Sequence, residues 1–179
     1  MGGCFVIKYL GYTVTFQEIP DEVTLCFNIT NCPHRCIGCH SPELQHDIGK
    51  DLEPDIIQII NKYIGGITCV CFMGEGNDWD ALLRCMYLVS DNYPDLKIAL
   101  YTGLDDKLYT QYVTGRHTSR DIHEPLVNYL KIGKYDPDKG GLNNPSTNQR
   151  LLYHDYVGLE NFFDKDITPK FWQKGFHNG

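Results

Sequence analysis

Residues 23–30 read VTLCFNIT, an alternation of apolar with small or polar residues that is typical of a β-strand. Further along the chain, residues 67–73 read ITCVCFM, a nearly continuous apolar run that predicts a strand covered on both faces. Residues 97–101 and 127–132 predict two more strands. These four segments are the predicted core strands of one sheet.

Helical patterns separate the four strands. They lie at residues 54–64 and 78–93 and, more weakly, at 104–113 and 119–126. The alternation of strand and helix predicts an α/β fold with a mainly parallel sheet and right-handed crossovers. Because a complete eight-fold barrel needs about 250 residues, a chain of 179 residues can supply only an open fraction of a barrel or a small doubly wound sheet.

The two ends of the chain carry other patterns. A strand near residues 12–17 precedes the first core strand, and Ile19-Pro20-Asp21-Glu22 predicts the turn of an N-terminal hairpin. After Arg150 the sequence becomes aromatic and polar. We therefore predict one domain over residues 1–154 and a loosely packed C-terminal tail over residues 155–179.

Composition and charge argue against several classes of protein. Sixteen basic and twenty-three acidic residues give a net charge of −7, which disfavours a general binder of nucleic-acid phosphates. No apolar run approaches the roughly 20 residues that span a bilayer, and no signal-peptide pattern is visible. We expect a cytoplasmic protein that binds neither nucleic acid nor membrane. In that setting, clustered cysteines favour a metal site or catalysis over disulfides.

Three of the eight cysteines, Cys32, Cys36 and Cys39, lie in one loop that directly follows the first core strand. Their C-x₃-C-x₂-C spacing offers three thiolates that can hold three corners of an iron–sulfur cube and leave one iron free for a substrate. A Cys₃His zinc site, for which no fourth ligand is obvious, and ordinary thiols are the alternatives. The other cysteines are predicted to be core residues: Cys4, Cys26, Cys69, Cys71 and Cys85.

The segment NCPHRCIGCHSPEL, residues 31–44, resembles the cluster loop of the activating enzymes of anaerobic (class III) ribonucleotide reductase. These enzymes belong to the radical S-adenosylmethionine (SAM) superfamily, and the resemblance extends over about residues 12–150. It implies an open partial (β/α) barrel of the radical SAM type. It also implies that Cys32, Cys36 and Cys39 bind a [4Fe-4S] cluster and that SAM is the second cofactor.

Later landmarks carry the same resemblance. Met73-Gly74-Glu75-Gly76 is similar to the superfamily's Gly-Gly-Glu element, which the resemblance assigns to the amino group of SAM. Glycines allow a close backbone approach, and a carboxylate accepts hydrogen bonds from an ammonium. The resemblance also implies SAM contacts for Thr102 and Gly38. Asn148-Gln149-Arg150 resembles a C-terminal element of the family, which could contact SAM or the protein partner or form a plain surface turn.

The resemblance implies an oxidoreductase with no catalytic residue beyond the cluster ligands. In the family, a flavodoxin-like donor reduces the cluster, and SAM is cleaved to methionine and a 5′-deoxyadenosyl radical. The radical takes a hydrogen atom from a glycine of the large subunit of anaerobic ribonucleotide reductase, which leaves a glycyl radical. Two alternatives stay open: another radical SAM enzyme, such as an activase of a glycyl-radical lyase or a deazaguanine synthase, and a non-enzymatic zinc-binding module.

Overall fold

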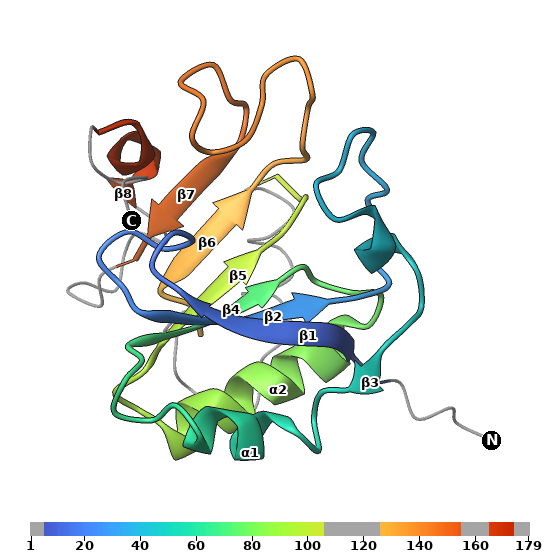
Figure 1. The fold of residues 1–179 in the computed structure, drawn as a ribbon, viewed down its shortest axis with the longest axis vertical. Helices are drawn as coiled ribbons and strands as arrows, with labels where there is room; N and C mark the ends of the chain where they lie inside the picture. Colours follow the sequence, from blue (N-terminus) through green and yellow to red (C-terminus); the bar gives the residue numbers. More distant parts are fainter. Residues whose placement is uncertain (1–5, 106–125, 155–164, 174–179) are drawn as a thin grey trace.

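The computed structural model describes residues 6–105, 126–154 and 165–173. These residues form one sheet of eight strands in the order β3-β1-β2-β4-β5-β6-β7-β8 (Figure 1). The strands are β1 (Lys8–Thr15), β2 (Thr24–Ile29), β3 (Lys50–Asp51), β4 (Cys69–Met73), β5 (Lys97–Tyr101), β6 (Tyr129–Ile132), β7 (Arg150–Tyr153) and β8 (Lys165–Asp166). The helices are α1 (Ile56–Asn61) and α2 (Trp79–Asn92), together with the 3₁₀-helices η1 (Pro42–Gln45) and η2 (Thr168–Trp172).

The predicted core strands and the two predicted major helices are present. Strands β2, β4, β5 and β6 pair in parallel, in that order, and β1 forms the expected N-terminal hairpin with β2. Helix α2 begins after Asp78, whose carboxylate accepts a 2.9 Å hydrogen bond from Ala81 N, as an N-cap residue does. The prediction of a mixed α/β fold with an open sheet is therefore confirmed.

The sheet is not mainly parallel, and that part of the prediction is wrong. Four strand pairings are antiparallel and three are parallel. A parallel return needs a crossover of a dozen or more residues, usually a helix. The segments 16–23 and 133–149, which join β1 to β2 and β6 to β7, contain no helix and return the chain antiparallel. The four residues of β7 and the two residues each of β3 and β8 are too few to show a strand period.

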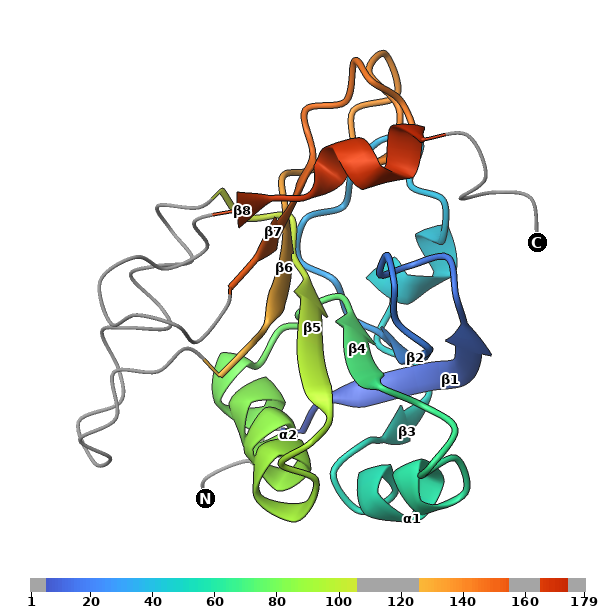
Figure 2. The ribbon, with the colours of Figure 1, turned by 90° about the vertical axis from the view of Figure 1, so that its left-hand side faces the viewer.

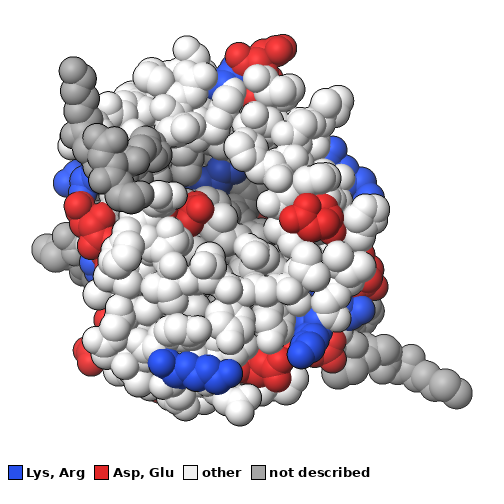
Figure 3. Space-filling model, viewed as in Figure 1, with Lys and Arg blue, Asp and Glu red and all other residues white. Residues whose placement is uncertain are grey.

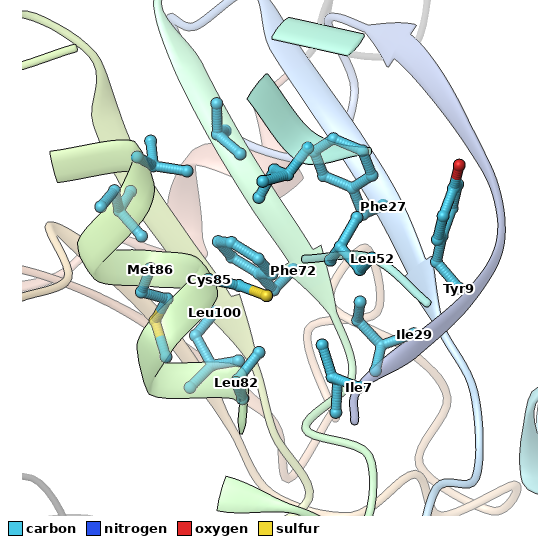
Figure 4. Packing of buried hydrophobic residues seen from close by; sticks show 14 of the residues in the cluster. Ile7, Tyr9, Phe27, Ile29, Leu52, Phe72, Leu82, Cys85, Met86 and Leu100 are labelled. Carbon is cyan, nitrogen blue, oxygen red and sulfur yellow. The ribbon is translucent and has the colours of Figure 1, made fainter. Parts of the chain in front are cut away.

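Helices α1 and α2 cover one face of the sheet (Figure 2). Because successive strand residues point to opposite faces, Val70 and Phe72 of β4 face these helices and Cys69 and Cys71 face away. Figure 4 shows Phe72 packed with Leu82 and neighbouring side chains of this apolar layer. This core fixes the positions of β2, β4 and β5, the strands whose carboxyl ends lead into the predicted site.

The opposite face of the sheet is covered by two segments that are far apart in the sequence. Ile19, from the turn of the N-terminal hairpin, packs there together with Ile167 and with Phe171 of η2. Lys170 and Asp21 form an ion pair that joins the two segments. Residues 165–173 are therefore part of the packed structure, and the prediction of a loosely packed tail is wrong for them, because their apolar side chains find an apolar sheet face.

The predictions for the remaining cysteines and helices can be compared with this structure. The four non-loop cysteines that it describes are all buried, as predicted: Cys26, Cys69, Cys71 and Cys85. Cys4 lies outside the described residues, as do almost all of the helical stretches predicted at 104–113 and 119–126. No helix in the described part of the chain has the length and apolar character needed to cross a membrane.

Candidate functional site

The four parallel strands end at one edge of the sheet, which we call the carboxyl edge. Asn28 of β2, Met73 of β4, Tyr101 of β5 and Lys131 of β6 lie side by side in the strand register. The segments that follow these residues therefore emerge together. In open α/β sheets, ligands bind at this edge. The surface of the face seen in Figure 1 is largely uncharged and has a hollow in which basic atoms are visible (Figure 3).

The loop after β2 carries the three predicted cluster ligands. Cys32, Cys36 and Cys39 are free thiols and partly buried. The base of the loop is fastened by a backbone hydrogen bond from Cys32 N to the carbonyl of Leu44, at 3.0 Å. Gln45 Nε2 donates to the carbonyl of Cys36 at 3.3 Å. Burial raises the pKa of the Cys32 thiol, while backbone hydrogen bonds from the following residues oppose that change.

The cysteine loop packs against the segment that joins β6 to β7. The rings of His40 and Tyr135 meet edge to face with centroids 5.3 Å apart. Gly38 has a φ of +69°, and a Cβ at this position would lie 3.4 Å from Pro137 Cβ. A Cβ could be accommodated at that distance, so it is the positive φ of the turn between Cys36 and Cys39 that favours glycine here. Its predicted contact with SAM stays a prediction.

Glu75 and Thr102, the two side chains predicted to bind SAM, are brought together. Both are buried, and the Thr102 hydroxyl donates a hydrogen bond to Glu75 Oε2. The same hydroxyl oxygen accepts a 2.9 Å hydrogen bond from Leu104 N. Gly74 and Gly76 flank Glu75 with φ values of +122° and +62°, which explains why glycines occupy both positions.

His34 joins the cysteine loop to this pair. Its Nε2 lies 2.5 Å from Glu75 Oε1, and both side chains are almost fully buried. The two atoms are close, but they do not form an aligned hydrogen bond. Nε2 of His34 therefore has no hydrogen-bond partner among the described residues. Oε1 of Glu75 thus faces His34 of the cysteine loop, and Oε2 is held by Thr102 at the end of β5. Sequence reasoning did not assign this role to His34, because the contact joins segments 41 residues apart.

Lys131 is a second site residue that the sequence patterns did not reveal. It is partly buried near the end of β6, and its Nζ donates a 2.8 Å hydrogen bond to the carbonyl of Gly133. Burial lowers the pKa of Lys131 to about 8. The nearby groups that oppose this lowering are Cys36, Cys32, Cys39 and Glu75. A lysine at the end of a core strand carries no pattern of its own, so only its place beside β5 shows that it belongs to the site.

Asn148-Gln149-Arg150 also lies at the carboxyl edge, because Arg150 pairs with Ile132. Gln149 is buried, and its side chain donates to the carbonyl of Gly133 at 3.2 Å. Asn148 Nδ2 donates to the carbonyl of Lys134 at 2.9 Å. These amides therefore stabilise the segment between β6 and β7. A contact with SAM or with a protein partner stays a prediction for them.

The donor set can be compared with the metals it would hold. Within residues 6–105, 126–154 and 165–173, no three Cys, His, Asp or Glu side chains gather as ligands of a single metal ion. A Cys₃His zinc site would need a histidine, but His34 faces Glu75 and His40 packs against Tyr135. Three free thiols on one loop, each able to bind a separate iron, fit an iron–sulfur cluster better than a single zinc ion.

Comparisons with protein-family models, with curated proteins and with solved structures gave no match. A function for this chain must therefore be inferred from the site itself, from the identity and arrangement of its residues.

The packing of His34 against Gly103 gives a direct test of the site geometry. A Cβ on Gly103 would lie 2.5 Å from His34 Cδ2. We expect Gly103→Ala to displace the imidazole from Glu75 and to lower the free energy of unfolding by about 1–3 kcal/mol. Urea denaturation of the protein would measure this loss. In a His34→Ala background the same substitution should cost clearly less, and an equal cost in both backgrounds would contradict the contact.

Proposed function

We propose that the protein is a radical SAM activating enzyme, which cleaves SAM reductively and generates a glycyl radical on the large subunit of an anaerobic ribonucleotide reductase. The observation that carries this proposal is the convergence at the carboxyl edge of the C-x₃-C-x₂-C loop with Glu75 and Thr102. As part of the proposal, we interpret the open sheet with four central parallel strands as a reduced, partial form of the radical SAM barrel.

The cofactors are part of the proposal. When bound by Cys32, Cys36 and Cys39, a [4Fe-4S] cluster supplies the single electron that breaks a carbon–sulfur bond of SAM. The donor of that electron is proposed to be a reduced flavodoxin-like protein. What the chain itself contributes is a fixed position for SAM and a partial exclusion of water, which a docked partner would complete.

Glu75 is the residue proposed to bind the ammonium of SAM. A charge-assisted hydrogen bond between a buried carboxylate and an ammonium is stronger than a bond between neutral groups. Thr102 holds one carboxylate oxygen of Glu75, so the other oxygen, which now faces His34, is available to a ligand if the imidazole moves aside. Thr102 thereby fixes the orientation of the carboxylate before SAM binds.

A protein substrate agrees with the exposed surface of the cysteine loop. Ile37 lies between Cys36 and Gly38 and is 84% exposed. A large apolar side chain at the rim of a reactive site is stabilised when a partner covers it. A partner that docks over the loop would also complete the shielding of the radical from solvent, which the open sheet cannot provide alone.

The proposal is tested by metal analysis of anaerobically purified protein. We expect iron and acid-labile sulfide in equal amounts and no stoichiometric zinc. After reduction, an electron paramagnetic resonance signal should appear, and its shape should change when SAM is added. Zinc in place of iron would show that the protein is a zinc-binding module and not an activase. A paramagnetic resonance signal whose shape does not change on addition of SAM would contradict SAM binding at the cluster.

Glu75 should control the affinity for SAM. Removing the charge in Glu75→Gln should weaken SAM binding about 10- to 150-fold, since a hydrogen bond to a charged group contributes roughly 1.5–3 kcal/mol. Equilibrium dialysis with the cluster-loaded protein would measure this change. Glu43→Gln, an exposed neighbour of the cysteine loop, should bind SAM like the wild type. Iron content should not change in either variant, and an unchanged SAM affinity in Glu75→Gln would refute the assignment.

A further inference from the structure

Lys131 has no role in the chemistry described above, although it lies inside the site. It pairs with Tyr101 of β5 and with Leu151 of β7, so its backbone lies in the interior of the sheet. Two residues before it, Tyr129 faces the side of the sheet away from the helices, and strand periodicity places Lys131 on that same side. Its ammonium reaches the carboxyl edge, where it binds the carbonyl of Gly133.

The ammonium of Lys131 has no carboxylate partner at ion-pair distance among the described residues. The segment that follows Lys131 contacts the cysteine loop, through Tyr135 against His40 and through Pro137 beside Gly38. Glu75 is already engaged with His34 and Thr102. A partly buried positive charge that is left unpaired is costly. Its position at the carboxyl edge, next to the segment that packs against the cysteine loop, indicates that its natural partner is an anion held by that loop.

An iron–sulfur cluster with three thiolate ligands is such an anion. Reduction adds one electron to it and neither forms nor breaks a bond, so the reduced cluster carries one more negative charge. Net charge close to a cluster is one of the factors that set its reduction potential. A positive charge in a partly desolvated site acts more strongly than the same charge in water.

We propose that Lys131 is the counter-charge of the cluster and raises its reduction potential in the absence of SAM. This inference rests on the proposed function, because it requires the cluster. Lys131 would not bind iron. Its positive charge would stabilise the reduced cluster, so that an electron donor of moderate potential could reduce it.

The test is a redox titration of the cluster-loaded protein at pH 7 without SAM, followed by electron paramagnetic resonance. In Lys131→Met we expect the equilibrium between reduced and oxidised cluster to shift about tenfold toward the oxidised form, which is a potential lower by about 59 mV. Lys131→Arg keeps the charge and should stay close to the wild type. Lys134→Met, an exposed neighbour, removes the same net charge outside the site and should leave the potential unchanged.

The outcomes of this titration separate the counter-charge role of Lys131 from SAM binding by Lys131 and from failure of the proposed function. Equal iron content with a lower potential only in Lys131→Met supports the counter-charge. An unchanged potential overturns it, and if SAM affinity falls at the same time, Lys131 binds SAM instead. Should Lys131→Met fail to fold, Lys131→Gln repeats the test with a polar side chain. If the wild-type protein assembles no cluster, the proposed function itself fails and this inference falls with it.

Discussion

Replacing Cys36 with Ser is expected to reduce bound iron and sulfide to background and to abolish SAM cleavage. A serine hydroxyl is a much poorer ligand for iron in a cluster than a thiolate. The loop supplies only three ligands, so no spare thiol can take over the lost position. Cys32→Ser and Cys39→Ser should give the same result. Iron and sulfide quantification, together with SAM cleavage after reduction, would measure the loss.

Cys85→Ala is the matched control for this prediction. Cys85 is buried in α2, and burial raises the pKa of its thiol to about 12, so it is neither reactive nor a ready metal ligand. Its replacement should cost on the order of 1 kcal/mol of stability and leave iron content unchanged. Full SAM cleavage by Cys36→Ser, or loss of iron in Cys85→Ala, would contradict the assignment of the ligands.

The central part of the fold could be predicted because its signals are local. The apolar run of β4 and the capped start of helix α2 can each be recognised within a short stretch of sequence. The flanking strands could not be predicted in the same way. Strand β8 has two residues and depends on pairing with β7, and η2 is held by contacts to a hairpin turn about 150 residues earlier in the chain. Such long-range contacts leave no periodic trace in the sequence.

In the candidate site too, residues with a local sequence signal could be predicted and residues defined by long-range contacts could not. Glu75 and Thr102 follow directly from strand ends, so the topology of a parallel sheet was enough to place them side by side. The contact of His34 and the place of Lys131 were not predicted, because each depends on another segment of the chain: Glu75 for His34, and the neighbouring strand β5 for Lys131. The chemistry that the residue types indicate stays a prediction, and the residue types could not indicate which side chains of different segments face one another.

Mixing the reduced enzyme, SAM and the cognate anaerobic reductase is expected to produce a glycyl radical, seen as a doublet in the electron paramagnetic resonance spectrum of the reductase. Without the reductase, SAM cleavage should be uncoupled and no glycyl signal should form. The difference is expected to be all or none, because the proposed acceptor of the radical is a glycine of the reductase. If a small purine or pterin is turned over while the reductase gains no radical, a synthase replaces the activase.

Docking of the reductase can be separated from the chemistry by changing the surface alone. Truncation after Asp155 is a poor test, because it removes β8 together with the buried side chains of Ile167 and Phe171 and would disturb the sheet. Ile37→Ser is a better one. Burial of an isoleucine side chain contributes about 1.5–3 kcal/mol, so this variant should bind the reductase roughly 10- to 150-fold more weakly.

Ile64→Ser is the matched control for Ile37→Ser, since Ile64 is 50% exposed and follows α1, away from the cysteine loop. Both isoleucines lie outside the residues proposed to bind the cluster and SAM, so both substitutions should leave iron content and uncoupled SAM cleavage unchanged. Ile64→Ser removes a half-buried side chain and should lower the free energy of unfolding by about 1 kcal/mol. Only Ile37→Ser should lower the yield of glycyl radical at limiting reductase, and excess reductase should restore it, because the defect is in binding. Equal yields from the two variants at every reductase concentration would show that the partner does not dock over the cysteine loop.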